Sequence, residues 1–178
     1  MLFRSVSQSR YVRYDDIVFV GLYTGADYSQ LKTARTNSYA FHFLKEIFPE
    51  KNFIPLRLKK HDTDPRQGVL HLDCTFMPVG NGKALIYKDG FLHPEDYQIV
   101  VDVFGKESIF EITQEEMVYM NTNVFSISPE VVVSEQHFTR LNAHMEQQWG
   151  LTVEKVPYRE ISKMGGLLRC STLPLIRE

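Results

Sequence analysis

The sequence NVFSISPEVVV at residues 123–133 predicts a β-hairpin, because two strand-like runs flank the turn Pro129-Glu130. Its second half is a β-branched run of the kind that strands favour. Ser134 can then cap an amphipathic helix over about residues 135–149, and a further strand is predicted over residues 152–158. This segment therefore predicts a unit in the order strand, strand, helix, strand.

The same order is predicted upstream. Two strand-like runs, residues 69–76 and 83–87, are joined through Gly80-Asn81-Gly82, which is a strong hairpin signal. A helix bracketed by Pro94 and Gly105 and a strand at residues 109–112 complete this unit, which begins 54 residues before the other. A repeat of this length with mixed content predicts an array of α/β modules, either closed into a propeller-like ring or extended as a solenoid.

The flanking segments predict part of a third unit and a connector. The predicted elements are a strand at residues 17–21, a helix at about 37–48, a strand at 52–58, a short helix opened by the capping box Thr113 and Glu116, and a last strand at about 167–173 that would open a further unit. The sequence therefore predicts the α/β class, with about three repeated units.

Length and composition favour one globular domain over residues 1–178. The net charge is −2, so no basic field predicts binding to nucleic acid. No apolar run approaches the roughly 20 residues of a membrane span, and the first residues lack a secretory signal, so we expect a soluble, cytoplasmic protein. A small-molecule ligand is the expected partner.

A polar pair stands within the strand predicted at residues 69–76. The two-residue period of a strand places His71, Asp73 and Thr75 on one face, and the apolar side chains with Cys74 on the other. Same-face neighbours lie about 6.5 to 7 Å apart, so an imidazole and a carboxylate could reach one small ligand. The alternative is that this face meets solvent.

Cys170 follows the paired glycines Gly165-Gly166 and stands next to Arg169. Glycines let the backbone approach a ligand closely, and a neighbouring cation can lower the pKa of a thiol, so Cys170 is a candidate nucleophile. The alternative is a small apolar side chain in a strand. Cys74 falls on the apolar face of its predicted strand, and we assign it to packing.

Arg35 precedes a predicted helix, whose N-terminus attracts anions, and an arginine there can hold a substrate carboxylate. The alternative is an exposed surface arginine. Neither a metal site nor a cofactor is expected, because the remaining histidines have no ligand-like spacing with one another or with either cysteine: His42, His61, His93, His137 and His144.

Four blocks of the sequence together resemble the guanidino-group-modifying enzyme superfamily of arginine deiminases, dimethylarginine dimethylaminohydrolases and amidinotransferases. The blocks, in family order, are Arg35-Thr36-Asn37, His71-Leu72-Asp73, residues 123–133, and Gly165-Gly166 leading to Arg169-Cys170-Ser171-Thr172. The resemblance implies the pentein fold, a pseudo-fivefold α/β-propeller of ββαβ modules around a central substrate site. About three of the five modules would be present here.

The resemblance also implies roles for the candidate residues. Cys170 would attack the guanidinium carbon and His71 would protonate the leaving amine, giving a covalent amidino-thioether intermediate. Asp73 would bond and polarise the guanidinium, and Arg35 would hold the substrate α-carboxylate. The implied activity is hydrolysis of arginine or a related guanidino compound. Amidino transfer to an amine is the alternative, and the triplet beginning at His71 looks more like that of deiminases and amidinotransferases than that of dimethylarginine hydrolases.

The sequence departs from the family in its acidic groups. An E-G-G-D motif is expected before the strand at residues 17–21, where Ser7-Gln8-Ser9-Arg10 stand instead, and a further aspartate of the N-terminal modules has no counterpart. Either the N-terminal modules are missing or supplied by a partner chain, or the chain is an inactive remnant that binds a guanidino ligand or itself. The exposed edges of an incomplete ring favour association, as a homo-oligomer or with the missing modules.

Overall fold

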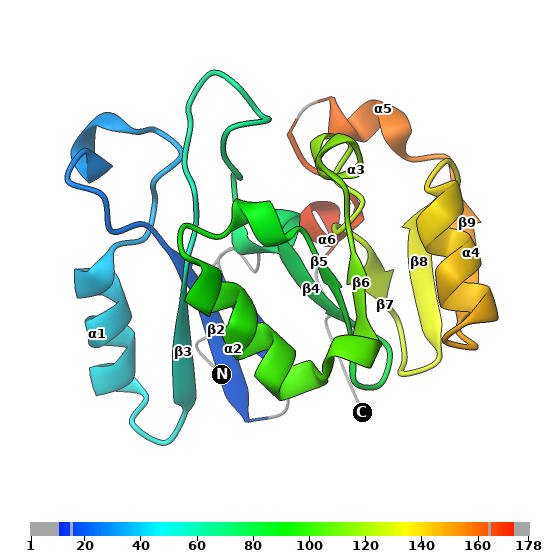
Figure 1. Cartoon of the computed structure of the whole chain (residues 1–178), viewed down its shortest axis with the longest axis horizontal. Coiled ribbons are helices and arrows are strands. Elements are labelled where there is room, and N and C mark those ends of the chain that lie inside the picture. Colours follow the sequence, from blue (N-terminus) through cyan, green and yellow to red (C-terminus); the bar gives the residue numbers. More distant parts are fainter. Residues whose placement is uncertain (1–10, 15, 164, 173–178) are drawn as a thin grey trace.

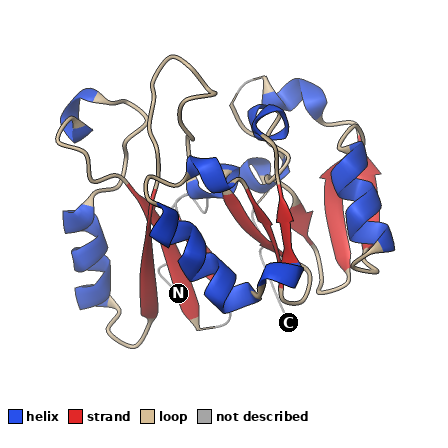
Figure 2. Ribbon diagram, viewed as in Figure 1, coloured by secondary structure: helices blue, strands red, loops and turns tan. Residues whose placement is uncertain are grey.

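Three small sheets of the same topology make up the described part of the chain, residues 11–14, 16–163 and 165–172 of a computed structural model (Figure 1). In each sheet the first strand is antiparallel to the second, and the second is parallel to the third. A helix connects the second strand to the third each time (Figure 2). Each sheet with its helix is therefore one ββαβ module.

The modules follow one another along the chain. Module 1 contains β1 (Tyr11–Tyr14), β2 (Ile17–Leu22), α1 (Ser38–Ile47) and β3 (Asn52–Arg57). Module 2 contains β4 (Phe76–Val79), β5 (Lys83–Ile86), α2 (Pro94–Phe104) and β6 (Ile109–Glu111). Module 3 contains β7 (Phe125–Ser126), β8 (Val131–Glu135), α4 (Thr139–Gln147) and β9 (Thr152–Val156).

Short helices connect and follow these modules: α3 (Gln114–Val118), α5 (Arg159–Ser162), α6 (Leu168–Ser171) and 3₁₀ helices at Tyr28–Gln30, Leu72–Cys74, Lys88–Gly90 and Lys106–Ser108. The capping box predicted for α3 is present in full, with Thr113 and Glu116 bonding each other's backbone N–H groups. No helix among the described residues is both long and apolar enough to cross a membrane.

The predicted order of elements is confirmed, and module 1 shares it because β1, which the sequence pattern did not predict, pairs with β2. The strand predicted at residues 69–76 is wrong except for its last residue. Its centre is the 3₁₀ helix Leu72–Cys74, with His71 as N-cap. The ammonium group of Lys60 binds the two backbone carbonyls that precede His71, so these carbonyls are engaged by a side chain rather than by a neighbouring strand.

Two other predictions need correction. The strand predicted at residues 167–173 is instead the short helix α6, and residue 173 lies outside the described residues. The helix predicted from residue 135 begins at Thr139, because β8 pairs with β9 up to Glu135. Ser7-Gln8-Ser9-Arg10, at the place of the acidic family motif, also lie outside the described residues.

One continuous apolar core joins the three modules. At the contact of modules 1 and 2, Phe19 of β2 and Phe76 of β4 meet edge to face at 5.0 Å, and Phe104 of α2 packs on both rings. Aromatic pairs of this kind add to the free energy gained from burying their area. The modules are therefore held together by side-chain packing, since each sheet is separate from the others.

Each later helix also contacts the third strand of the module before it. Asp96 of α2 is fully buried and accepts hydrogen bonds from Arg57 at the end of β3. In the next module, Arg140 of α4 stacks over the ring of Phe110 in β6 at 4.1 Å, and His144 lies 4.6 Å from the same ring. The same kind of contact thus forms twice within the chain.

Candidate active site

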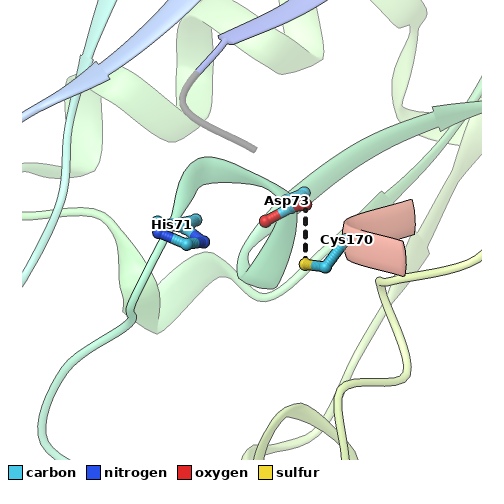
Figure 3. Close-up of side chains that lie close together, drawn as sticks. All are labelled: His71, Asp73 and Cys170. Atoms are coloured by element: carbon cyan, nitrogen blue, oxygen red, sulfur yellow. Dashed lines mark hydrogen bonds between the residues drawn. The ribbon is translucent and has the colours of Figure 1, made fainter. Parts of the chain in front are cut away.

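His71, Asp73 and Cys170 lie together at the end of module 2 that faces α6 (Figure 3). Their donor atoms are all within 4.8 Å of one another. His71 and Asp73 come from the 3₁₀ helix Leu72–Cys74 and its N-cap, and Cys170 comes from α6. The sequence placed the first two on one face of a strand; they share the site through a tight helical turn, which brings them closer together than a strand would.

Asp73 is the buried anion of this site, with no exposed surface. One carboxylate oxygen accepts a hydrogen bond from the Asn123 amide at 3.0 Å and lies 3.5 Å from the sulfur of Cys170. Burial raises the pKa of Asp73 to about 6, although Cys170, the Arg169 charge and Asn123 act in the opposite direction. The carboxylate is therefore mostly ionised at neutral pH.

Asn123 connects the parts of the site, and the sequence did not identify it as a site residue. Its amide nitrogen donates to Asp73 and lies 3.2 Å from the Cys170 sulfur. Its carbonyl oxygen accepts from the backbone N–H groups of Arg169, at 3.0 Å, and Cys170, at 3.3 Å. The residue is fully buried, so it fixes α6 against the 3₁₀ helix.

Cys170 is an exposed residue, but its sulfur points toward Asp73 (Figure 3). Burial of the sulfur and the negative charge of Asp73 raise the pKa of this thiol to about 11. The expectation that Arg169 would lower this pKa is therefore wrong. The thiol is protonated at neutral pH.

Cys74 lies on the other side of the same carboxylate, with its sulfur 3.9 Å from Asp73. Its side chain belongs to the apolar core, as the sequence analysis assigned, and burial strongly raises its thiol pKa. A thiol that is both protonated and enclosed is inert toward reagents in solution.

Arg35 is exposed and approaches His71, with Nη1 3.4 Å from Nε2 of the imidazole. A guanidinium can only donate, so this contact requires His71 to accept at Nε2, as the neutral ring does. The helix that follows is capped by Asn37, whose side chain accepts from the backbone of Ala40. Arg35 thus stands before α1, as predicted, and reaches the site from module 1.

Lys60 binds the backbone that precedes His71. After Asn123, it is the second site residue that the sequence analysis did not identify. Its ammonium donates to the carbonyl of Val69 at 2.9 Å and to that of Leu70 at 2.7 Å. Burial lowers the pKa of Lys60 to about 8, with Cys74 opposing and Arg35 reinforcing this shift. Lys60 therefore holds the segment that leads directly into the imidazole.

The cluster also offers three ligand types that zinc accepts, namely an imidazole nitrogen, a carboxylate oxygen and a sulfur. A cavity of about 380 Å³ has Leu70, Cys74 and Gly165 in its wall, but none of the three residues of the cluster. The absence of a cofactor was expected from the sequence, and it stays a prediction.

Comparison with known proteins agrees with the superfamily that the motifs indicate, but not with the preference, drawn from the triplet at His71, for deiminases and amidinotransferases over dimethylarginine hydrolases. The family model described as "N,N dimethylarginine dimethylhydrolase, eukaryotic" matches residues 32–177. The chain belongs to this family. It is also 30% identical to the uncharacterized protein YkgA of Bacillus subtilis (strain 168), over 99% of this chain and 54% of YkgA. The chain therefore spans about half the length of this relative.

Solved structures share the fold of the family. The N-terminal domain of ArgZ, covalently bound to a reaction intermediate, superposes with a TM-score of 0.73 at 18% identity, covering 93% of this chain and 54% of that domain. ArgZ is described as a cyanobacterial arginine dihydrolase. A dimethylarginine dimethylaminohydrolase adduct with S-methyl-L-thiocitrulline gives 0.68 at 20% identity, covering 93% and 54%. The expected guanidino-modifying superfamily and pentein fold are thus confirmed, with three modules described here.

Proposed function

We propose that the protein hydrolyses a guanidino compound, arginine or a methylated arginine, through a covalent intermediate on Cys170. The observation that supports this most is the meeting of a thiol, a buried carboxylate and an imidazole within 4.8 Å. These three groups are what such a reaction needs: a nucleophile, an anion to hold the cationic guanidinium, and a proton carrier. The family membership supports the same class of substrate.

The substrate itself would activate the nucleophile. Asp73 carries a negative charge at neutral pH and raises the pKa of Cys170 to about 11. A guanidinium bound against Asp73 places a positive charge beside both groups, which offsets the carboxylate and lowers the thiol pKa. The thiolate then forms where it can attack, and free enzyme would keep a protonated, less reactive thiol.

The reaction then proceeds in two stages. Neutral His71 takes the proton of the Cys170 thiol, and the thiolate bonds to the guanidinium carbon. The C–N bond to the leaving amine breaks as the His71 imidazolium gives that nitrogen the proton. The neutral imidazole next takes a proton from water, which attacks the amidino-thioether carbon. The C–S bond then breaks, the sulfur of Cys170 takes back a proton from the imidazolium, and the former water oxygen loses its second proton to solvent as the ureido carbonyl forms.

Arg35 is the proposed ligand of the substrate α-carboxylate. It now lies within 3.4 Å of His71, near the reacting end of a substrate. It is exposed, so its side chain can turn outward to a carboxylate at the far end of an arginine-length molecule. Its present contact would keep His71 neutral until a carboxylate draws it away.

The test is intact-mass analysis of the folded chain after incubation with arginine or dimethylarginine, together with assays for ureido product and released ammonia or amine. We expect an amidino adduct on Cys170 and ureido product without any added amine. A requirement for glycine or another amine acceptor would assign the protein to the amidinotransferases. Folded protein that forms neither adduct nor product would support a binding remnant and reject the hydrolase.

A further inference from the structure

Asp62 joins two loops that leave the same end of the module 1 sheet (Figure 1). One oxygen of its carboxylate accepts from the backbone N–H of Thr33 at 3.0 Å and from the hydroxyl of Thr33 at 2.9 Å. The other oxygen accepts from the backbone N–H of Lys32 at 2.9 Å. The N–H groups of Lys32 and Thr33 hold the pKa of Asp62 below its usual range, so the carboxylate is ionised at neutral pH. Three charge-assisted bonds thus link segments that are 29 and 30 residues apart in sequence.

The first of these loops, residues 31–36, carries Arg35 and leads to α1. The carbonyl that follows Arg35 accepts from the backbone N–H of Tyr23, next to the end of β2, at 2.9 Å. On the other side, Nε of Arg35 donates to the carbonyl of Lys32 at 3.4 Å. The N–H of Lys32 is bound by Asp62 and its carbonyl by the guanidinium group, so the place of Arg35 depends on that of Asp62.

The second loop, residues 59–69, leads directly into His71. Its two end residues are joined by a backbone hydrogen bond of 3.0 Å, and Lys60 binds the two carbonyls before His71. Asp62 therefore belongs to the segment that is fixed against the imidazole. Through its bonds to the first loop, it places Arg35 and His71 in one frame.

A second aspartate of the same loop has different partners. Asp64 accepts from the backbone N–H of Arg66 and from the side-chain amide of Gln67, both at 2.9 Å, and these partners lie within the 59–69 loop. Hydrogen bonds from the same two residues lower its pKa, so it carries the same charge as Asp62. The two aspartates share a loop and a charge, and they differ in that Asp62 bonds to the loop of Arg35.

We propose that Asp62 is a positioning residue that sets the place of Arg35, and with it the preference for guanidino ligands that carry an α-carboxylate. This role rests on the function proposed above, in which Arg35 takes that carboxylate. A ligand whose guanidinium lies against Asp73 has a fixed length, so Arg35 must stand at the matching distance. Anchoring its backbone reduces the conformational freedom that is lost on binding.

The test compares the binding of L-arginine with that of agmatine, which has the same guanidinium chain and amine but no carboxylate. Isothermal titration in the Cys170→Ser chain measures both without turnover. That chain should prefer arginine, and adding Arg35→Ala should lower the preference by about tenfold, because charge-assisted bonds to the carboxylate are lost. Adding Asp62→Ala should lower it by about fivefold and change agmatine binding by less than about twofold.

Three further variants separate positioning from other effects. Asp64→Ala removes the same charge from the same loop, and it should leave the preference unchanged. Asp62→Ala combined with Arg35→Ala should show the preference of Arg35→Ala alone, because Asp62 acts through Arg35. Asp62→Asn keeps one acceptor oxygen and should recover part of the preference.

Four results would overturn the proposal. Equal losses of arginine and agmatine binding in Asp62→Ala would mean that Asp62 binds the ligand amine or only supports the fold. An unchanged preference in Asp62→Ala would mean that Arg35 is held without it. The same loss in Asp64→Ala would assign the effect to the loop as a whole. A chain without any preference for arginine, including one that binds neither ligand, would mean that Arg35 does not take the carboxylate.

The outcome is separate from that of the hydrolase proposal. Binding in the Cys170→Ser chain involves no reaction, whereas the hydrolase is judged by the adduct on Cys170 and by the ureido product. Adduct formation without a preference for arginine would reject the role of Asp62 and keep the nucleophile. A preference that depends on Asp62 in a chain that forms no adduct would support the positioning role in a binding remnant.

Discussion

Two thiols flank one carboxylate in this protein, and only one of them is open to reagents. The sulfur of Cys74 lies 3.9 Å from one oxygen of Asp73, and that of Cys170 lies 3.5 Å from the other. The negative charge of Asp73 acts on both thiols, and both have a raised pKa. The difference lies in access and orientation, because Cys170 is exposed and held by Asn123, whereas Cys74 is enclosed in the core.

The largest expected effect is loss of labelling in Cys170→Ser. Wild-type protein treated with 2-chloroacetamidine should gain one amidine adduct, because the cationic reagent can bind Asp73 and bring its carbon to the sulfur. Cys170→Ser should gain none, and Cys74→Ser should label like the wild type. Intact mass and peptide mapping measure this, and an adduct on Cys74 in folded protein would contradict the comparison of the two thiols.

The next effect separates the charge of Asp73 from its packing role. In Asp73→Asn the thiol pKa of Cys170 should fall below about 11, because the neighbouring anion is gone. Alkylation by neutral iodoacetamide at pH 8 should therefore become about tenfold faster per unit of pKa shift. Alkylation by cationic 2-chloroacetamidine should instead become slower, because the anion that attracts the reagent is lost.

Opposite changes with the two reagents are the decisive outcome. Equal changes with both would indicate that Asp73→Asn only alters access to Cys170. The pH profile gives a further check, since the iodoacetamide rate of the wild type should keep rising toward pH 11, while that of Asp73→Asn should level off earlier.

The framework of this site could be predicted from sequence, and its internal contacts could not. Turn residues such as Gly80 and Gly82, which have φ of 53° and 69°, announce the hairpins of the modules because they tolerate that conformation. The alternation around His71 and Asp73 has the period of a strand, yet Lys60 and the contacts around Asp73 impose a 3₁₀ turn. Tertiary hydrogen bonds therefore outweigh the local sequence pattern in setting the conformation of this segment.

The role of Asn123 depends on a contact across 47 residues of sequence. A buried amide at the start of a hairpin carries no local sign that its partner is a cysteine in a later helix. The thiol pKa of Cys170 was predicted in the wrong direction for a similar reason. Arg169 is its neighbour in sequence, but Asp73 is its neighbour in space.

Asn123→Ala should weaken both stability and labelling. Two backbone N–H groups and the buried carboxylate of Asp73 would lose their partner, which costs about 1–3 kcal/mol for each buried group left unsatisfied. Denaturant unfolding should show this loss, and adduct formation on Cys170 should slow several-fold because α6 is no longer fixed. Asn123→Asp is the control, since it restores an acceptor for α6 and adds a second anion beside the sulfur. It should slow iodoacetamide while recovering part of the stability; equal behaviour of the two variants would argue against this role.

Lys60 should affect the His71 side of the site and leave the thiol side almost unchanged. Its pKa is lowered to about 8 from 10.5, so between these values Lys60 binds more protons in the unfolded chain than in the folded one, and its own contribution to stability, read as the difference between wild type and variant, should rise with pH across that window. Lys60→Met and Lys60→Arg should both lack this rise, because neither side chain titrates there. Lys60→Arg should retain the bonds to the carbonyls before His71, and with them more of the turnover. Iodoacetamide labelling of Cys170 should change by less than about twofold. A large change in labelling would mean that Lys60 acts on the thiol side of the site as well as on the His71 side.

The smallest effect on reactivity is expected at Cys74. Cys74→Ala should leave the rate of Cys170 labelling unchanged, because the enclosed thiol is protonated and carries no charge toward Asp73. Cys74→Ala should instead affect core packing. Removal of the buried sulfur should lower the free energy of unfolding by about 1 kcal/mol. Cys74→Ser should lower it further, since a buried hydroxyl costs more to remove from water than a thiol does, and the Asp73 oxygen that faces this position lies 3.9 Å from the sulfur, too far for a normal O–H···O hydrogen bond. Denaturant midpoints for the two variants, measured beside their labelling rates, compare packing with chemistry directly. If Cys74→Ala slowed the labelling of Cys170 as strongly as Asn123→Ala, then the two thiols would be coupled through Asp73, and Cys74 would have to be counted among the groups that tune the nucleophile.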